Sequence, residues 1–77
     1  MITFKLTSKN GSKNYYSFST MGLSGSLIID SVSFEIEFVE LSGFLKDNEK
    51  EKDKFLYLAK KTLQDKHFPS YFVFATH

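Results

Sequence analysis

Two glutamates separated by one residue are the first pair in this sequence whose spacing suits a chemical reaction. Glu35 and Glu37 flank Ile36, and in a strand this spacing places both carboxylates on one side, about 7 Å apart. Paired carboxylates at such a distance can serve an inverting glycosidase. The flanking residues form no pattern typical of a cleft, so we expect a solvated strand face and no catalytic role.

A glycine–serine segment offers a second candidate for chemistry. The residues 22–26, Gly-Leu-Ser-Gly-Ser, lack the last glycine of the G-x-S-x-G nucleophile elbow, because Ser26 stands in its place. A phosphate-binding loop would need a following Lys-Ser, Lys-Thr or helix, and none follows. Since glycine and serine clusters are typical of loops, we predict a flexible loop over residues 21–26.

The two histidines, His67 and His77, offer little metal chemistry. His67 lies where a helix is expected to end, and a cation there is favoured by the helix dipole. No second histidine or acidic residue stands at metal-ligand spacing from it, and the chain has no cysteine. We therefore predict no metal, no cofactor and no enzymatic activity.

Charged residues of opposite sign occupy different parts of the chain. All ten basic residues are lysines, and arginine, the side chain best suited to bidentate contacts with guanine and phosphate, is absent. Three lysines stand unopposed before residue 30, and an acidic segment without lysine follows. The lysines are Lys5, Lys9 and Lys13, and the acidic residues are Asp30, Glu35, Glu37 and Glu40. This separation predicts a polarised surface rather than the basic stripe of a nucleic-acid reader.

Length and composition predict one small folded domain over residues 1–77. The chain is 42% hydrophobic and has nine phenylalanines and four tyrosines, and most of the phenylalanines are expected in the core. Neither a secretory signal nor a stretch of the roughly 20 apolar residues needed to cross a bilayer is present. We therefore expect a cytoplasmic protein without a membrane contact.

The strongest strand pattern covers residues 31–40. Val32, Phe34, Ile36 and Phe38 alternate with polar residues, which is typical of a strand with one buried face. Residues 27–30 form either a separate short strand or the front half of one long bent strand, and we favour a break or bulge near residues 30–31. Val39 interrupts the alternation, so the strand is expected to end or bulge there.

Residues 2–7 and 15–19 alternate in the same way and predict a hairpin around Asn10-Gly11. A pairing that places Phe4 opposite Phe18 also places Leu6 opposite Tyr16, so that apolar side chains share one face. A tight two-residue Asn-Gly turn would slip this register by one residue and send those side chains to opposite faces. We therefore predict a loop of three or five residues.

A helix is predicted from about residue 48 to residue 67. Asn48 is the expected N-cap, with Glu51 as its capping-box partner, and Pro69 prevents continuation of the helix. The apolar stripe that should face the sheet consists of Phe55, Leu58, Ala59, Thr62 and Leu63, with Leu56 beside it. The last strand, residues 71–76, is apolar on both sides, so it either lies centrally in the sheet or presents one side as a contact surface.

These elements predict an α+β fold: a four- to five-stranded, mainly antiparallel sheet with one helix on one face, in the order β-β-β(-β)-α-β. One helix can cover one face, so the other is available to a partner. The partner is expected to be a larger protein or a second copy of the chain, as in a homodimer. The residues predicted to contact it are Asp30, Glu35, Glu37, Glu40, Tyr15 and Tyr71.

The sequence therefore predicts a non-enzymatic protein-binding module. Small size, the absence of cysteine and arginine, and a composition rich in lysine and phenylalanine also fit the general profile of phage or mobile-element proteins that inhibit host enzymes, including anti-restriction and anti-CRISPR proteins. The alternative is a module that binds single-stranded nucleic acid through Lys5, Lys9, Lys13 and aromatic side chains of the sheet.

Overall fold

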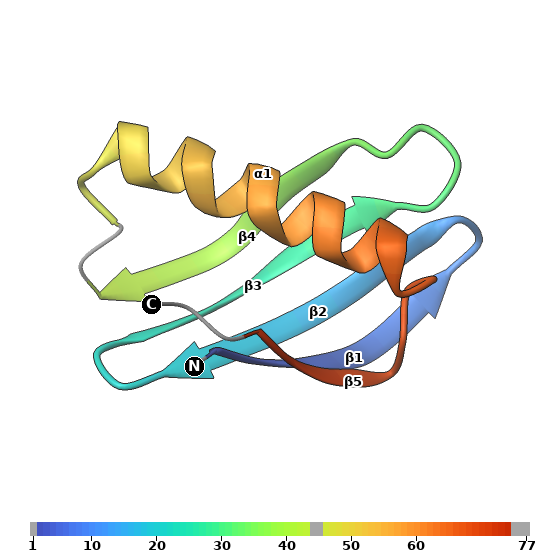
Figure 1. Ribbon diagram of the computed structural model, residues 1–77, viewed down its shortest axis with the longest axis horizontal. Coiled ribbons are helices and arrows are strands. Elements are labelled where there is room, and N and C mark those ends of the chain that lie inside the picture. The colour runs from blue at the N-terminus through green and yellow to red at the C-terminus, as the bar shows by residue number, and fades with distance from the viewer. Residues whose placement is uncertain (1, 44–45, 75–77) are drawn as a thin grey trace.

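The computed structural model describes residues 2–43 and 46–74, which form five strands and one helix (Figure 1). Four consecutive strands, Ile2–Asn10 (β1), Lys13–Thr20 (β2), Leu23–Asp30 (β3) and Ile36–Gly43 (β4), precede the helix Glu49–Asp65 (α1) and the last strand Tyr71–Phe74 (β5). The sheet has the order β4-β3-β2-β1-β5, and each neighbouring pair is antiparallel. The predicted α+β class and element order are confirmed.

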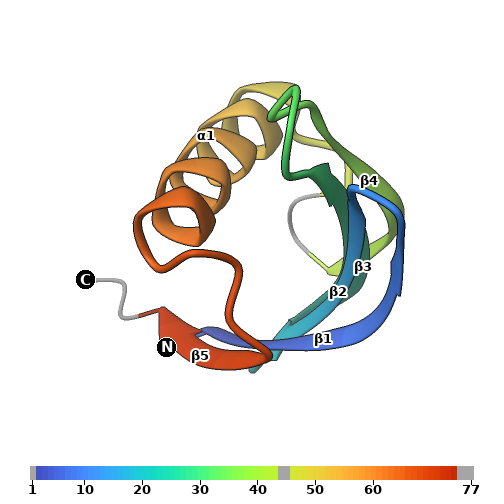
Figure 2. The same cartoon turned by 90° about the vertical axis from the view of Figure 1, so that its right-hand side faces the viewer.

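The sheet curls around the helix, which lies on its concave side (Figure 2). Side chains that point toward the helix form the core, because this face is the one removed from water. The buried apolar residues are Ile2, Phe4, Tyr16, Phe18, Leu23, Leu27, Ile29, Ala59, Leu63 and Phe72. One element of the fold therefore shields one face of the sheet, and the opposite face has no helix over it.

Phenylalanine rings connect the layers of the core. The ring centroids of Phe4 and Phe72 lie 4.8 Å apart in neighbouring strands, and those of Phe18 and the helical Phe55 lie 5.0 Å apart. Phe38 of β4 also packs against Phe55, at 5.8 Å. Such pairs add roughly 0.5–1.5 kcal/mol each beyond the area they bury. The expectation that phenylalanine builds the core is thus met in both the helix and the sheet.

The first hairpin has the predicted side-chain pairing but not the predicted loop. Phe4 lies opposite Phe18 and Leu6 opposite Tyr16. The loop itself has two residues, Gly11-Ser12, because Asn10 pairs with Lys13. A bulge between Leu6 and Ser8 takes up the extra residue, so the prediction of a three- or five-residue loop was wrong. Gly11 has a φ of 62°, which glycine adopts without a steric cost.

The predicted flexible loop over residues 21–26 was also wrong. Met21 and Gly22 alone form the turn, and β3 begins at Leu23. Gly25 lies within this strand opposite Phe18 and Leu41. A Cβ at Gly25 would collide with the Glu40 carbonyl oxygen and lie 2.9 Å from Cζ of Phe18. Glycine here therefore allows close packing, and it does not mark a loop.

The stretch 31–40 is half loop and half strand. The chain breaks after Asp30, as predicted, and β4 begins at Ile36, so the predicted strand over residues 31–35 was wrong. Val32 is 76% exposed, whereas Phe34 adopts a φ of 63° and stacks on Phe68 with a centroid distance of 6.4 Å. The bulge predicted at Val39 is confirmed, because Leu27 pairs with Phe38 and Ser26 with Glu40.

The helix α1 begins and ends within two residues of the predicted positions. The Asn48 side chain accepts a hydrogen bond from the Glu51 backbone N–H, at 3.3 Å, which confirms the N-cap. Ala59 and Leu63 are buried, and Phe55 and Leu56 pack against the core. Leu58 was wrongly included in the inward stripe, because it is 40% exposed.

The last strand lies at an edge of the sheet and pairs with β1. Phe72 points into the core, whereas Tyr71 and Val73 are 55% and 42% exposed. A central position is therefore excluded for β5, and the alternative of an exposed side remains. The residues 75 and 76, which were also assigned to this strand, lie outside the described part of the chain.

Candidate partner-binding face

The face of the sheet that points away from α1, called here the outer face, is crossed by rows of side chains from neighbouring strands. The register of the strand pairs sets these rows. One row consists of Val73, Thr3, Ser19, Ser24 and Ser42. The next consists of Tyr71, Lys5, Ser17, Ser26 and Glu40. A third consists of Tyr15, Ile28 and Glu37. Small hydroxyl side chains thus occupy the middle of the outer face, and rings lie toward its margins.

Charges of opposite sign lie on different strands of the outer face. Lys5 belongs to β1 and Lys13 to β2, whereas Glu37 and Glu40 belong to the edge strand β4. Lys13, however, pairs with Asp30 of β3 and lines the same small cavity as Glu37, so the predicted separation of charge is present only in part. Within residues 2–43 and 46–74, both ion pairs lie on α1, Lys52 with Glu49 and Lys54 with Glu51. The glutamates of the outer face therefore form no ion pair among the described residues.

Three of the predicted acidic contact residues meet at a small hollow. Asp30, Glu35 and Glu37 line a cavity of about 130 Å³ together with Lys13. Glu35 precedes β4 and belongs to the turn, so the proposed placement of Glu35 and Glu37 on one strand was wrong. The turn nevertheless brings both carboxylates to the same hollow.

Asp30 uses its carboxylate to hold the turn that follows β3. Oδ1 accepts hydrogen bonds from the backbone N–H groups of Val32 and Ser33, at 2.8 and 3.0 Å, and Oδ2 accepts one from the Ser12 hydroxyl, at 3.0 Å. The hydrogen bonds from Ser33 and Val32 hold the pKa of Asp30 below its ordinary value of 3.8. These bonds give Asp30 a structural role, whereas Glu35 and Glu37 remain available to solvent.

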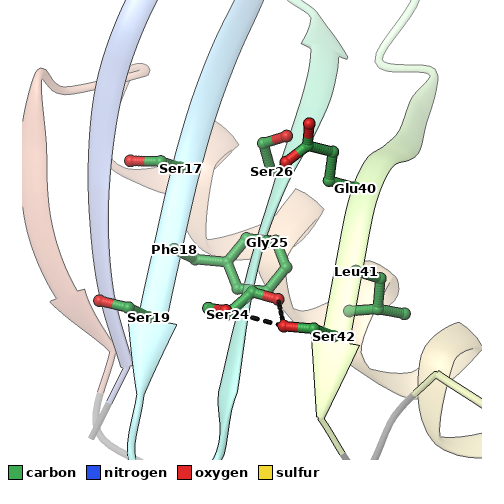
Figure 3. Close-up of a pocket in the computed structure, with 9 residues that line it drawn as sticks. All are labelled: Ser17, Phe18, Ser19, Ser24, Gly25, Ser26, Glu40, Leu41 and Ser42. Carbon is green, nitrogen blue, oxygen red and sulfur yellow. Dashed lines mark hydrogen bonds between the residues drawn. The ribbon is translucent and has the colours of Figure 1, made fainter.

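Glu40 lies apart from that hollow, at a wider concavity formed by β2, β3 and β4 (Figure 3). The concavity has a volume of about 490 Å³. Its polar lining consists of Ser17, Ser19, Ser24, Ser26, Ser42 and Glu40. The Oγ atoms of Ser24 and Ser42 lie 2.8 Å apart and share a hydrogen bond, which Figure 3 shows across the β3–β4 pair.

The sequence identified part of this concavity. Ser17 and Ser19 were expected on the outer face, but Ser24 and Ser26 were assigned to a loop. A signal was present, because Leu23, Leu27 and Ile29 keep one parity around Gly25, and all three are buried. A period-two pattern with one glycine is typical of a strand that another side chain approaches closely.

The two tyrosines predicted to meet a partner lie far apart on the outer face. Tyr15 pairs with Ile28 in β3 and is half-buried, whereas Tyr71 is at the β5 edge opposite Lys5. Lys9 and Lys13 lie at the end of the β1–β2 hairpin. Lys5 and Lys9 thus lie on β1, which two strands separate from β4, whereas Lys13 lies beside Asp30.

Metal and membrane sites have little support in the described residues. No group of three or more histidine, cysteine, aspartate or glutamate side chains that could hold a metal ion occurs within them. His67 follows the helix and has a φ of 58°, and His77 lies outside the described part. In that same part, α1 is neither long enough nor apolar enough to cross a membrane.

Comparisons with known proteins leave this face without a precedent. No family model, no curated protein and no solved structure was found to match the chain.

Proposed function

We propose that this protein is a non-enzymatic binding module whose acidic margin docks onto a basic surface of a larger protein. The acidic margin consists of Glu35, Glu37 and Glu40. The observation that supports it most directly is that these exposed carboxylates lie on or beside the edge strand β4 and form no ion pair among the described residues.

Charge separation on one face suits a role in recognition. An acidic margin accelerates the encounter with a basic partner and disfavours acidic ones. The serines beside it present short side chains, so that backbone and hydroxyl groups are accessible to a partner. Tyr71 and Val73 extend the same face with exposed apolar area at the β5 edge. A partner that covers the sheet from β4 to β5 would contact the glutamates at the β4 edge and the exposed apolar side chains at the β5 edge.

The class of partner follows from the size and composition of the chain. In this proposal the chain is a small phage or mobile-element protein in the cytoplasm, and its partner is a host enzyme that it inhibits. A second copy of the chain is the other option, because the polarised face places lysines within reach of another molecule's glutamates.

The acidic margin can be tested by neutralising its three glutamates. We expect Glu35→Gln, Glu37→Gln and Glu40→Gln together to weaken binding of the captured partner at least about tenfold, since charge-assisted contacts contribute roughly 1.5–3 kcal/mol each. The measurement is affinity capture from host lysate, followed by titration of the purified partner at two salt concentrations.

The matched control neutralises three acidic residues of the helix, Glu49, Glu51 and Asp53. This variant changes the net charge equally but leaves the outer face intact. Equal affinity of both triple variants for the partner would overturn the proposed role of the acidic margin. Light scattering of the purified protein separates a homodimer from a complex with another protein.

A second candidate function rests on the cross-strand pair of Lys5 and Tyr71. A lysine beside an exposed ring is the arrangement that binds one phosphate and stacks one base of a single strand. If this pair binds nucleic acid, Tyr71→Ala should abolish a mobility shift with single-stranded DNA or RNA at low salt. Absence of any shift with the unmodified protein would exclude this candidate.

A further inference from the structure

The concavity formed by β2, β3 and β4 owes its charge to the bulge at Val39. In a regular pairing without the bulge, Val39 would pair with Ser26 and Glu40 with Gly25, and Glu40 would point toward the core, since side chains alternate along a strand. With the bulge, Glu40 pairs with Ser26 and Leu41 with Gly25. The bulge thus places one carboxylate on the outer face beside the serines, which is a common use of such irregularities near binding sites.

The concavity holds one carboxylate, which accepts hydrogen bonds, and several hydroxyl groups, which both donate and accept them. Ser17, Ser26 and Glu40 lie in one row on adjacent strands, about 5 Å from one Cα to the next. Among the described residues, the hydroxyl groups of Ser24 and Ser42 bond to each other, whereas those of Ser17 and Ser26 make no hydrogen bond. The Glu40 carboxylate likewise forms no ion pair there. A ligand that carries a positive charge and several N–H donors can therefore satisfy the Glu40 carboxylate and the hydroxyl oxygens together.

A guanidinium group meets these requirements better than an ammonium group does. It presents five N–H donors in a plane and pairs with a carboxylate through two parallel hydrogen bonds. The remaining donors can reach hydroxyl oxygens in the same row. Phe18, Gly25 and Leu41 also line the concavity, but the side chains of Phe18 and Leu41 pack in or against the core. The preference for a guanidinium therefore comes from the polar groups, and a guanidinium is also more weakly hydrated than an ammonium.

We propose that this concavity receives an arginine side chain of the partner protein. In this inference, which rests on the proposed function, the guanidinium donates two hydrogen bonds to the Glu40 carboxylate and further ones to the hydroxyl oxygens of Ser26 and Ser17. The volume of about 490 Å³ falls within the range of roughly 300–1,000 Å³ of small-ligand sites. The arginine therefore enters with part of the neighbouring peptide.

Three blocked tripeptides, with arginine, lysine or the neutral isostere citrulline at the centre, test the inference on the whole protein. Titration followed by ¹H–¹⁵N NMR should shift the amide signals of Ser17, Ser26 and Glu40 with the arginine peptide. We expect the lysine peptide to bind at least about fivefold more weakly and the citrulline peptide to leave the signals unchanged. Equal shifts with arginine and lysine, or shifts confined to other residues, would overturn the inference.

Two variants locate the binding site. Glu40→Gln removes the charge and should weaken binding of the arginine peptide at least about tenfold. Ser26→Val keeps a side chain that suits a strand but fills the concavity and removes a hydroxyl, so it should weaken the same peptide. The matched control is the double variant Glu35→Gln/Glu37→Gln, which should bind the peptide like the unmodified protein. Loss of binding in the control instead of in Glu40→Gln would contradict the proposed arginine-binding site.

The same variants separate this inference from the proposed function. If Glu35→Gln/Glu37→Gln weakens binding of the purified partner and Glu40→Gln does not, the acidic margin binds the partner but the proposed arginine site is wrong. If none of these variants affects the partner, the proposed function fails, and the tripeptide titration still decides whether the concavity binds a guanidinium.

Discussion

At the scale of single residues, Asp30 shows how one carboxylate organises the turn between β3 and β4. Its two oxygens accept three hydrogen bonds from Val32, Ser33 and Ser12. An aspartate that accepts from the backbone two and three residues ahead is typical of a turn. The acidic segment of the sequence therefore contains one residue that holds the fold and three that face solvent.

The lowered pKa of Asp30 predicts how stability responds to acid. The folded protein binds a proton to Asp30 at lower pH than the unfolded chain does, so the stabilisation is present above the ordinary pKa of 3.8 and is lost as the pH falls through the folded value. Asp30→Asn keeps an acceptor oxygen but removes the charge. Urea denaturation should show a lower free energy of unfolding for this variant at pH 7, and a smaller difference in strong acid.

Glu37→Gln is the control for this prediction, because Glu37 lies exposed in β4 and shares no hydrogen bond with the turn. A difference between Asp30→Asn and the unmodified protein that stays constant from neutral to strongly acidic pH would contradict the proposed cause.

At the scale of elements, the end of α1 carries a conformational cost. The backbone N–H of Phe68 donates to the Leu63 carbonyl at 2.9 Å, and that of His67 donates to Gln64 at 3.1 Å, which is the hydrogen-bond pattern of a Schellman motif. This motif requires a left-handed residue after the cap, and His67 adopts a φ of 58°. Glycine is the usual residue there because a side chain is strained in this conformation.

His67→Gly should therefore raise the free energy of unfolding by up to about 1 kcal/mol, the relief of strain being offset in part by the freer unfolded chain. Thermal denaturation measures the change. Lys66→Gly is the control, because Lys66 has a φ of −96° and should gain nothing from glycine. A His67→Gly variant that is no more stable than the unmodified protein would show that the strain is absent.

The elements also show where the sequence was informative. The sequence predicted the correct type of element for residues 2–7, 15–19 and 48–67. In each of them the apolar residues follow the strand or the helix period and face one core. Residues 31–35 follow the same period, but Phe34 stacks on Phe68 and Val32 lies in solvent. This contact joins two loops distant in sequence, so no local pattern could reveal it.

The sequence predicted only part of the concavity formed by β2, β3 and β4, for a similar reason. A Cβ at Gly25 would collide with Phe18 of the neighbouring strand, and this reason for a glycine inside a strand cannot be read from the glycine–serine segment alone. The acidic residues were identified by charge, but their separation into a turn-holding Asp30 and an outward Glu40 depends on hydrogen bonds and on the bulge. Their role in binding a partner stays a prediction.

At the scale of the whole molecule, one hydrogen bond ties the middle of the sheet to the connection between α1 and β5. The Tyr16 hydroxyl donates to the Pro69 carbonyl oxygen at 2.6 Å, across 53 residues of sequence. Burial raises the pKa of Tyr16 to about 12. Because the folded pKa lies above the ordinary value of 10.0, stability is complete below that pH and is lost as the pH rises toward the folded value.

Tyr16→Phe should lower the free energy of unfolding by about 1–3 kcal/mol, since it leaves the Pro69 carbonyl without this donor. It should also remove the part of the alkaline loss of stability that Tyr16 causes. Urea denaturation at neutral and alkaline pH measures both effects. Tyr15→Phe, on the outer face, is the control, and an equal effect of the two substitutions would contradict the role of the hydrogen bond.

The pairing of β5 with β1 also governs when this chain can fold during its synthesis. Residues 2–10 are synthesised early and residues 71–74 late. Until then one edge of β1 has no partner strand, and Phe4 lacks its contact with the ring of Phe72. Unsealed strands invite pairing with other chains. Completion of the fold therefore waits until β5 has been synthesised, and a chain truncated before residue 71 should be prone to aggregation.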